Sequence, residues 1–152
     1  MIKCGLYKTT EPIAEHEAVE AGLLVYFHNH SDAGTPIVLL PQKNEHNRWS
    51  FPARGFSIKD EAYLATLVSL KPEGLYRVTE HFHPDDSSVV ATDSLVQLGY
   101  NRAAEPILFF PQRVEDANGM SFPSKGTRVP PSIYELLAPL SVSGPVPQRK
   151  LH

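Results

Sequence analysis

The residues best suited to chemistry in this sequence are two His-x-His pairs, His28-Asn29-His30 and His81-Phe82-His83, the second followed by Asp85 and Asp86. Residues two apart on a β-strand project from the same face, so each pair could bind a divalent ion such as Zn²⁺ through two imidazoles. The pattern makes His81, His83 and Asp85 candidate metal ligands. Its specificity is low, and solvated or hydrogen-bonded surface histidines are the alternative interpretation.

Other catalytic patterns are missing from the sequence. Cys4 stands near the terminus, and no serine lies in a Gly-x-Ser-x-Gly elbow. The glycines form neither Gly-x-Gly-x-x-Gly nor a P-loop. The paired carboxylates Asp85-Asp86 and Glu115-Asp116 lie in predicted loops, where solvated turn residues are expected. We therefore expect a non-enzymatic protein with no cofactor, unless the histidines hold a divalent metal.

A binding surface is the remaining chemical candidate, and it centres on Trp49, the single tryptophan. Trp49 follows Arg48 and precedes the turn Pro52-Ala53-Arg54-Gly55. Aromatic and arginine side chains contribute disproportionately to protein interfaces, and an aromatic ring can also stack on a base. The alternative is that Trp49 belongs to the core, since Met120 occupies the matching place in the repeat described next.

An internal repeat organises the whole chain. Pro36-Ile37-Val38-Leu39-Leu40-Pro41-Gln42 returns as Pro106-Ile107-Leu108-Phe109-Phe110-Pro111-Gln112, and Ser50-Phe51-Pro52 returns as Ser121-Phe122-Pro123. Gly5-Leu6-Tyr7 likewise returns as Gly74-Leu75-Tyr76. The sequence therefore predicts a tandem duplication, with a first copy over residues 1–72, a second copy over 73–145, and a tail or tag remnant over 146–152.

Short strands are expected throughout, because fourteen prolines leave little room for helices. In the first copy we expect strands at 6–10, 23–29, 37–40, 49–51, 56–58 and 67–70. A polar loop is expected at 42–48, and one or two helical turns within 59–66. The second copy should repeat that order.

Gly5-Leu6-Tyr7 followed by an acidic stretch resembles the opening of an SH3 domain. The strand layout is also that of an SH3-like barrel, and we expect two five-stranded SH3-like barrels packed together. A single antiparallel β-barrel or sandwich is the alternative. The remaining peptide-groove pattern of SH3 domains is missing, so recognition of proline-rich peptides is not carried over.

Alternation along the second strand of each copy assigns its faces. Val25 and Phe27 match Val96 and Leu98, which predicts an inward face. Tyr26, His28 and His30 should point outward, as should their counterparts, which begin with Gln97. We therefore predict that the first copy binds a partner protein or peptide through Tyr26, His28, His30, Arg48, Trp49 and Arg54.

Composition narrows the partner classes. A net charge of −3 gives no global basic field, which makes nucleic acid an unlikely partner and leaves a nucleic-acid-binding tandem barrel as a lesser alternative. No apolar run is long enough to span a membrane, and a single cysteine fits a cytoplasmic location. The sequence does not indicate an oligomeric state.

Overall fold

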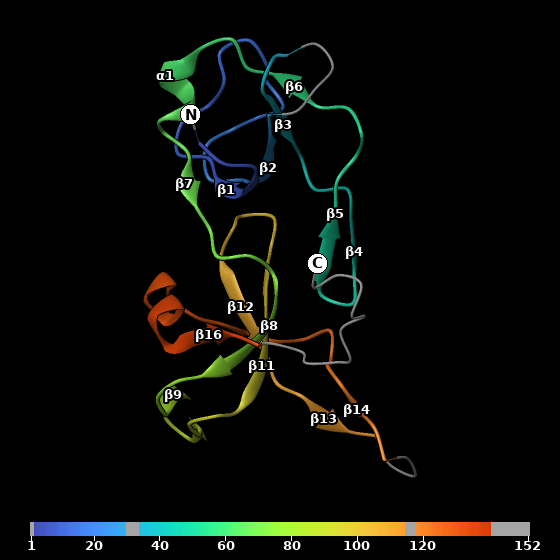
Figure 1. Ribbon diagram of the computed structural model, residues 1–152, viewed down its shortest axis with the longest axis vertical. Coiled ribbons are helices and arrows are strands. Elements are labelled where there is room, and N and C mark those ends of the chain that lie inside the picture. The colour runs from blue at the N-terminus through green and yellow to red at the C-terminus, as the bar shows by residue number, and fades with distance from the viewer. Residues whose placement is uncertain (1, 30–33, 115–117, 141–152) are drawn as a thin grey trace, which may run out of the picture.

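The computed structural model describes residues 2–29, 34–114 and 118–140. Antiparallel β-structure dominates, with two five-stranded sheets and three separate two-stranded hairpins (Figure 1). The prediction of a mainly β chain is confirmed.

The first sheet is built from the first copy, in the order β6-β3-β2-β1-β7. Its strands are β1 (Gly5–Lys8), β2 (Leu24–His28), β3 (Ile37–Leu39), β6 (Phe56–Ser57) and β7 (Val68–Ser69). One helical turn, α1 (Glu61–Leu64), joins β6 to β7. It begins at Asp60, whose side chain accepts a hydrogen bond from the Ala62 N–H.

The second sheet has the order β15-β12-β11-β8-β16. Its strands are β8 (Gly74–Val78), β11 (Leu95–Tyr100), β12 (Pro106–Phe109), β15 (Thr127–Arg128) and β16 (Leu137–Pro139). A 3₁₀ helix, η1 (Pro131–Leu136), replaces α1 between the last two strands. Strands that correspond along the chain therefore occupy corresponding places in the two sheets.

Equivalent contacts recur at the repeated positions. The Tyr7 hydroxyl donates to the Lys3 carbonyl at 2.7 Å, and the Tyr76 hydroxyl donates to the Pro72 carbonyl at 2.6 Å. Gly55 and Gly126 also correspond, because a Cβ on either would overlap a backbone carbonyl of the adjacent strand. Residues of the recurring sequence blocks thus make the same contacts in both copies.

Two clusters of buried side chains form the cores. Val25, Phe27 and Val38 lie in the first cluster, and Val96 and Leu98 lie in the second. The predicted inward faces of the two central strands are therefore confirmed. Two residues of the first sheet contact the second cluster instead: Leu24 is buried within it, and the half-buried Leu6 packs against it, so both tie the two copies together.

The predicted polar loop at 42–48 is wrong. Strand β4 (Lys43–Glu45) pairs with β5 (Arg48–Ser50) around a two-residue turn. His46 and Asn47 take φ values of 53° and 66°, and positive φ at both central residues is the requirement of a type I′ hairpin turn. The three residues of β4 are exposed, whereas Asn47 at the turn is buried.

Two more hairpins lie in the second copy. Strands β9 (Phe82–Asp85) and β10 (Ser88–Val90) pair in a segment where repeating the strand order of the first copy predicts no strand. Strands β13 (Gln112–Arg113) and β14 (Met120–Ser121) correspond to β4 and β5. In Figure 1 the β4–β5 hairpin extends alongside the second sheet, whereas β13–β14 projects away from both sheets.

The tip of the β4–β5 hairpin packs against β11. Asn47 is 7% exposed, and its side-chain amide donates to Gln97 Oε1 at 2.9 Å and to the Pro123 carbonyl at 3.0 Å. The Gln97 amide in turn donates to the His46 carbonyl at 3.0 Å. Gln97 is 8% exposed, so its predicted outward, solvent-facing position is wrong: the hairpin of the first copy covers it.

Candidate functional site

Trp49 lies where the two copies meet. Its indole N–H donates to the Tyr100 carbonyl at 2.7 Å, and the Arg102 guanidinium carbon lies 4.8 Å from the ring centroid. The backbone N–H of Trp49 donates to Glu73 Oε2 at 3.1 Å. The side chain is half-buried and packs against the second core cluster. These contacts make Trp49 a structural anchor between the copies.

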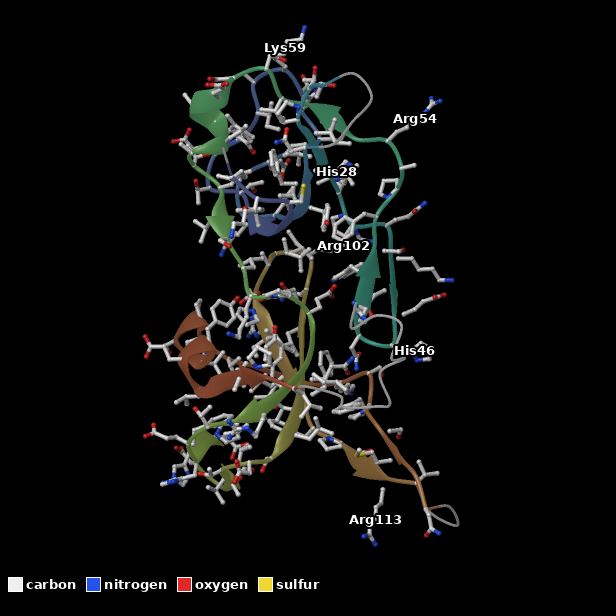
Figure 2. The ribbon with its side chains drawn as sticks, in the orientation of Figure 1. His28, His46, Arg54, Lys59, Arg102 and Arg113 are labelled. Atoms are coloured by element: carbon white, nitrogen blue, oxygen red, sulfur yellow. The ribbon has the colours of Figure 1, made fainter. Side chains whose placement is uncertain are left out.

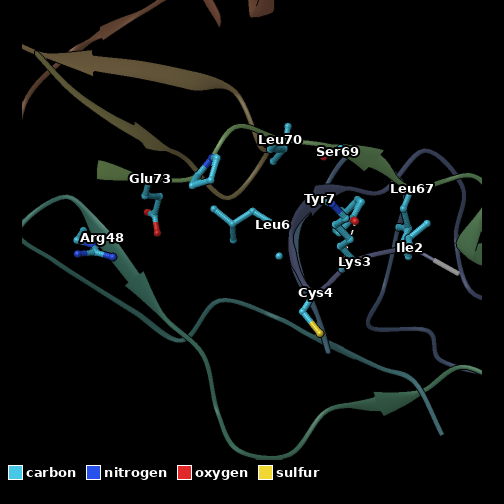
Figure 3. Close-up of a pocket in the computed structure, with 12 residues that line it drawn as sticks. Ile2, Lys3, Cys4, Leu6, Tyr7, Arg48, Leu67, Ser69, Leu70 and Glu73 are labelled. Carbon is cyan, nitrogen blue, oxygen red and sulfur yellow. Dashed lines mark hydrogen bonds between the residues drawn. The ribbon is translucent and has the colours of Figure 1, made fainter. Parts of the chain in front are cut away.

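Arg48, next to this anchor, borders a cleft of about 610 Å³ between the first sheet, the β5 strand and the segment that links the copies (Figure 3). We call it the junction cleft. Six of the residues that line it matter for the argument: Lys3, Cys4, Leu6, Arg48, Leu70 and Glu73. Its volume is within the range of about 300–1,000 Å³ that ligand sites occupy.

Tyr26 extends the same surface along β2. Tyr26 pairs directly with Leu6 on β1 and with Leu39 on β3, so the three side chains share one face of the sheet. Tyr26 is half-buried, and its ring lies 5.5 Å from that of Phe51. The predicted outward orientation of Tyr26 thus brings it beside the junction cleft, with an aromatic neighbour that partly covers it.

Cys4 and His28 come together on this face, a pairing that the sequence analysis missed. Cys4 Sγ lies 3.9 Å from His28 Nδ1, and the Asn29 N–H donates to the same sulfur at 3.4 Å. The contact follows from the pairing of Gly5 with Phe27, which continues to Cys4 and His28. Recognising that β1 and β2 pair antiparallel could have predicted it.

The other residues of the predicted partner-binding set are placed differently. His30 lies outside the described residues. Arg54 is exposed on the segment between β5 and β6 and extends away from the sheets in Figure 2. The structure therefore brings Tyr26, His28 and Arg48 to one region and leaves Arg54 at a separate edge.

Glu73 supplies the carboxyl group that lines the junction cleft. Burial raises the pKa of Glu73 above its ordinary value, while the Trp49 N–H and the Arg48 charge partly offset that rise. Lys3 and Arg48 are exposed. The cleft consequently combines an apolar floor with two cationic side chains and one partly buried carboxyl group.

The candidate metal ligands lie on and beside the β9–β10 hairpin. The rings of His81 and His83 are 6.4 Å apart at their centroids, and His83 Nδ1 is 3.1 Å from the Ser88 carbonyl. Asp85 accepts hydrogen bonds from the Ser87 N–H and hydroxyl, and these hydrogen bonds lower the pKa of its carboxyl group. Within residues 2–29, 34–114 and 118–140, no group of three or more His, Cys, Asp or Glu side chains is arranged to hold a metal ion.

Two arginines of the second copy are engaged in exposed ion pairs. Arg77 contacts Asp93 at 2.8 Å, and Arg128 contacts Glu105 at 3.2 Å. The Asn101 amide, followed by the Arg128 charge, lowers the pKa of Glu105. These pairs reduce the positive charge that the second copy presents to solvent.

No family model, curated protein or solved structure matches this chain. Among the residues that the structure describes, no helix has the length and apolar character needed to cross a membrane.

Proposed function

We propose that this chain is a non-enzymatic protein-interaction module that binds a partner protein or peptide through the first copy. The site comprises Tyr26, Arg48 and the junction cleft. The observation that carries the proposal is the cleft itself, in which Leu6 and Leu70 provide apolar surface near the cationic Lys3 and Arg48. The occupant that complements it is an extended segment with an apolar side chain and a neighbouring carboxylate.

A comparison of the copies supports this choice of face. In the second copy the tip of the β4–β5 hairpin occupies the corresponding face, where it covers Gln97. The hairpin backbone also approaches Gly99 closely: a Cβ at Gly99 would lie 2.9 Å from the Asn47 carbonyl oxygen. In the first copy, the position that corresponds to Gly99 is His28, whose side chain obstructs the same close approach. The first-copy face therefore cannot receive a hairpin in that way, which leaves it for a different molecule.

We further propose that each copy is an SH3-like barrel, with boundaries at 1–72 and 73–145. The support is the shared order of the five strands, in which the last strand pairs beside the first, and the helical turn that precedes it. The two cores with separate clusters of apolar side chains favour this assignment over a single large barrel.

The test is partner capture by Arg48→Ala, with Arg113→Ala as the matched control. Both arginines are exposed on corresponding hairpins, so neither change should alter the free energy of unfolding by more than about 0.5 kcal/mol. Arg48→Ala should weaken capture about thirtyfold, the effect of losing about 2 kcal/mol at an interface anchor. Equal capture by both variants would place the site elsewhere.

A further inference from the structure

The turn between β11 and β12 closes one end of the first sheet. In Figure 1 this turn extends from the second copy towards the first. The Arg102 carbonyl in the turn accepts a hydrogen bond from the Leu24 N–H at 2.8 Å, and the Arg102 guanidinium donates to the Pro41 carbonyl at 2.9 Å. Leu24 begins β2 and Pro41 follows β3, at the end where the pairing of these two strands stops. One arginine thus satisfies a backbone group beside each strand.

The second copy presents the same two backbone groups at Leu95 and Pro111, which match the two contact residues of the first copy in the repeat. The Val78 N–H donates to the Ser94 carbonyl, so the N–H of Leu95 points away from β8 and towards the side of β12. Beyond the pairing of β11 in its sheet, neither the Leu95 N–H nor the Pro111 carbonyl forms a hydrogen bond to another described residue. Both residues are half-buried, whereas their counterparts in the first copy are buried.

These two residues line a groove of about 650 Å³ at the end of β11 opposite the turn. The β9–β10 hairpin forms the other wall, where Val89 is 59% exposed, and Phe110 adds apolar surface. Asp85 is the one charged residue among the described residues that line the groove. The groove therefore combines apolar walls, an N–H donor, a carbonyl acceptor and a negative charge.

The first copy shows what such a place accepts. The Arg102 guanidinium carbon lies 4.8 Å from the centroid of the Trp49 ring, so two backbone groups and an aromatic face contact this arginine. In the second copy Met120 replaces Trp49, and it is 57% exposed on the β13–β14 hairpin, which projects away from both sheets (Figure 1). Because the first copy holds Arg102, the chain's own turn does not also fill the groove.

We propose that the groove of the second copy binds a partner protein through an exposed turn that carries an arginine. The turn carbonyl accepts from the Leu95 N–H, the guanidinium donates to the Pro111 carbonyl, and Asp85 balances the positive charge in place of the aromatic face. The volume lies within the range of about 300–1,000 Å³ that ligand sites occupy. This site is separate from the junction cleft and does not depend on the function proposed for it.

The probe that tests the proposal is the acetylated and amidated peptide Asn-Arg-Ala-Ala-Glu, the sequence of residues 101–105. It keeps the asparagine and glutamate that close the turn in the chain. The peptide lacks the high effective concentration of the turn within the chain, so binding is expected at millimolar concentrations. In a titration of the full chain followed by amide chemical shifts, the changes should concentrate in residues 84–95 and 110–111.

Two altered peptides test the recognition of the guanidinium. Citrulline in place of the arginine removes the charge and nearly keeps the shape, whereas lysine keeps the charge without the planar fork. Each replacement should weaken binding about tenfold. The affinity of the arginine peptide should also fall as the ionic strength rises, because an exposed carboxylate supplies the attraction.

Asp85→Asn should weaken binding of the arginine peptide by a similar factor, about tenfold. Asparagine keeps an oxygen acceptor for the Ser87 N–H, so the hairpin turn is retained. The matched control is Asp86→Asn, an exposed neighbour outside the groove, which should leave the affinity unchanged.

Absence of localised shifts at millimolar peptide, or equal affinities for the arginine, citrulline and lysine peptides, would overturn the proposal. Shifts confined to the first copy would also overturn it, because the peptide would then compete with the chain's own turn. Arg48→Ala should not affect this titration, so the proposal for the groove and the proposal for the junction cleft fail separately.

Discussion

At the scale of single residues, Asn47 carries the clearest prediction for stability. Its amide makes two hydrogen bonds in a buried position between the copies. Asn47→Ala would leave the Gln97 and Pro123 oxygen atoms without those donors, and alanine tolerates the positive φ of this turn poorly. We expect the free energy of unfolding to fall by about 2 kcal/mol in chemical denaturation.

Asn118 provides the matched control for this change. It lies in the corresponding hairpin of the second copy and is exposed. Asn118→Ala should change the free energy of unfolding by less than about 0.5 kcal/mol. If the two substitutions had equal effects, the hydrogen bonds between the hairpin and β11 would contribute nothing measurable.

Glu73 carries a prediction for pH dependence. Burial raises the pKa of Glu73 in the folded protein. The ionised carboxylate therefore lowers the free energy of unfolding when the pH is above this folded-state pKa. The loss disappears once the pH falls below the pKa that Glu73 has in the unfolded chain. Glu73→Gln keeps an oxygen acceptor for the Trp49 N–H without the charge. Its melting temperature should exceed that of the wild type near about pH 7, and the difference should shrink towards about pH 4.

The exposed Glu80→Gln serves as the comparison, measured across the same pH series. A melting temperature for Glu73→Gln that lies below the wild type at neutral pH would mean that attraction to Arg48 outweighs burial, contrary to this expectation.

At the scale of elements, the sequence predicted most strands of the two sheets but missed the β4–β5 hairpin. The strands of the first sheet lie within one or two residues of their expected bounds, because short Val, Ile and Leu runs between prolines and glycines leave few alternatives. In the second sheet β16 ends before the strand expected at 140–142, so that prediction is wrong. The β4–β5 hairpin was missed because His46-Asn47 lacks the glycine that usually marks a type I′ turn.

The burial of Gln97 could not be predicted from its own strand. Alternation along β11 places Gln97 on the face opposite Val96 and Leu98, and that part of the prediction holds. What covers this face is a hairpin about 50 residues earlier in the chain, docked through side-chain amides. Polar docking of this kind has no hydrophobic periodicity to reveal it.

The β9–β10 hairpin carries the prediction about metal. If His81, His83 and Asp85 bind a divalent ion, protein purified without a histidine-affinity column should contain close to one ion per chain. Elemental analysis measures this content. Well under one ion per chain would leave the histidines as hydrogen-bonded surface residues.

At the scale of the whole molecule, the two copies should depend on each other for stability. Leu24 belongs to the first sheet but is fully buried in the second core cluster, against which Leu6 and Trp49 also pack. Removing the second copy would expose these side chains, at a cost of about 1.5–3 kcal/mol for a fully buried residue. Fragment 1–72 should therefore fail to melt cooperatively as a monomer in calorimetry. A monomeric fragment with a sharp transition would contradict this dependence.

The face of the first copy beside the junction cleft is the centre of the functional account, and hydrogen–deuterium exchange of the chain with and without its captured partner tests it most directly. The account predicts protection concentrated in residues 3–7, 26–28, 48–51 and 69–73, which surround Tyr26, Arg48 and the cleft. Protection confined to the β9–β10 or β13–β14 hairpins, with these segments unchanged, would contradict it.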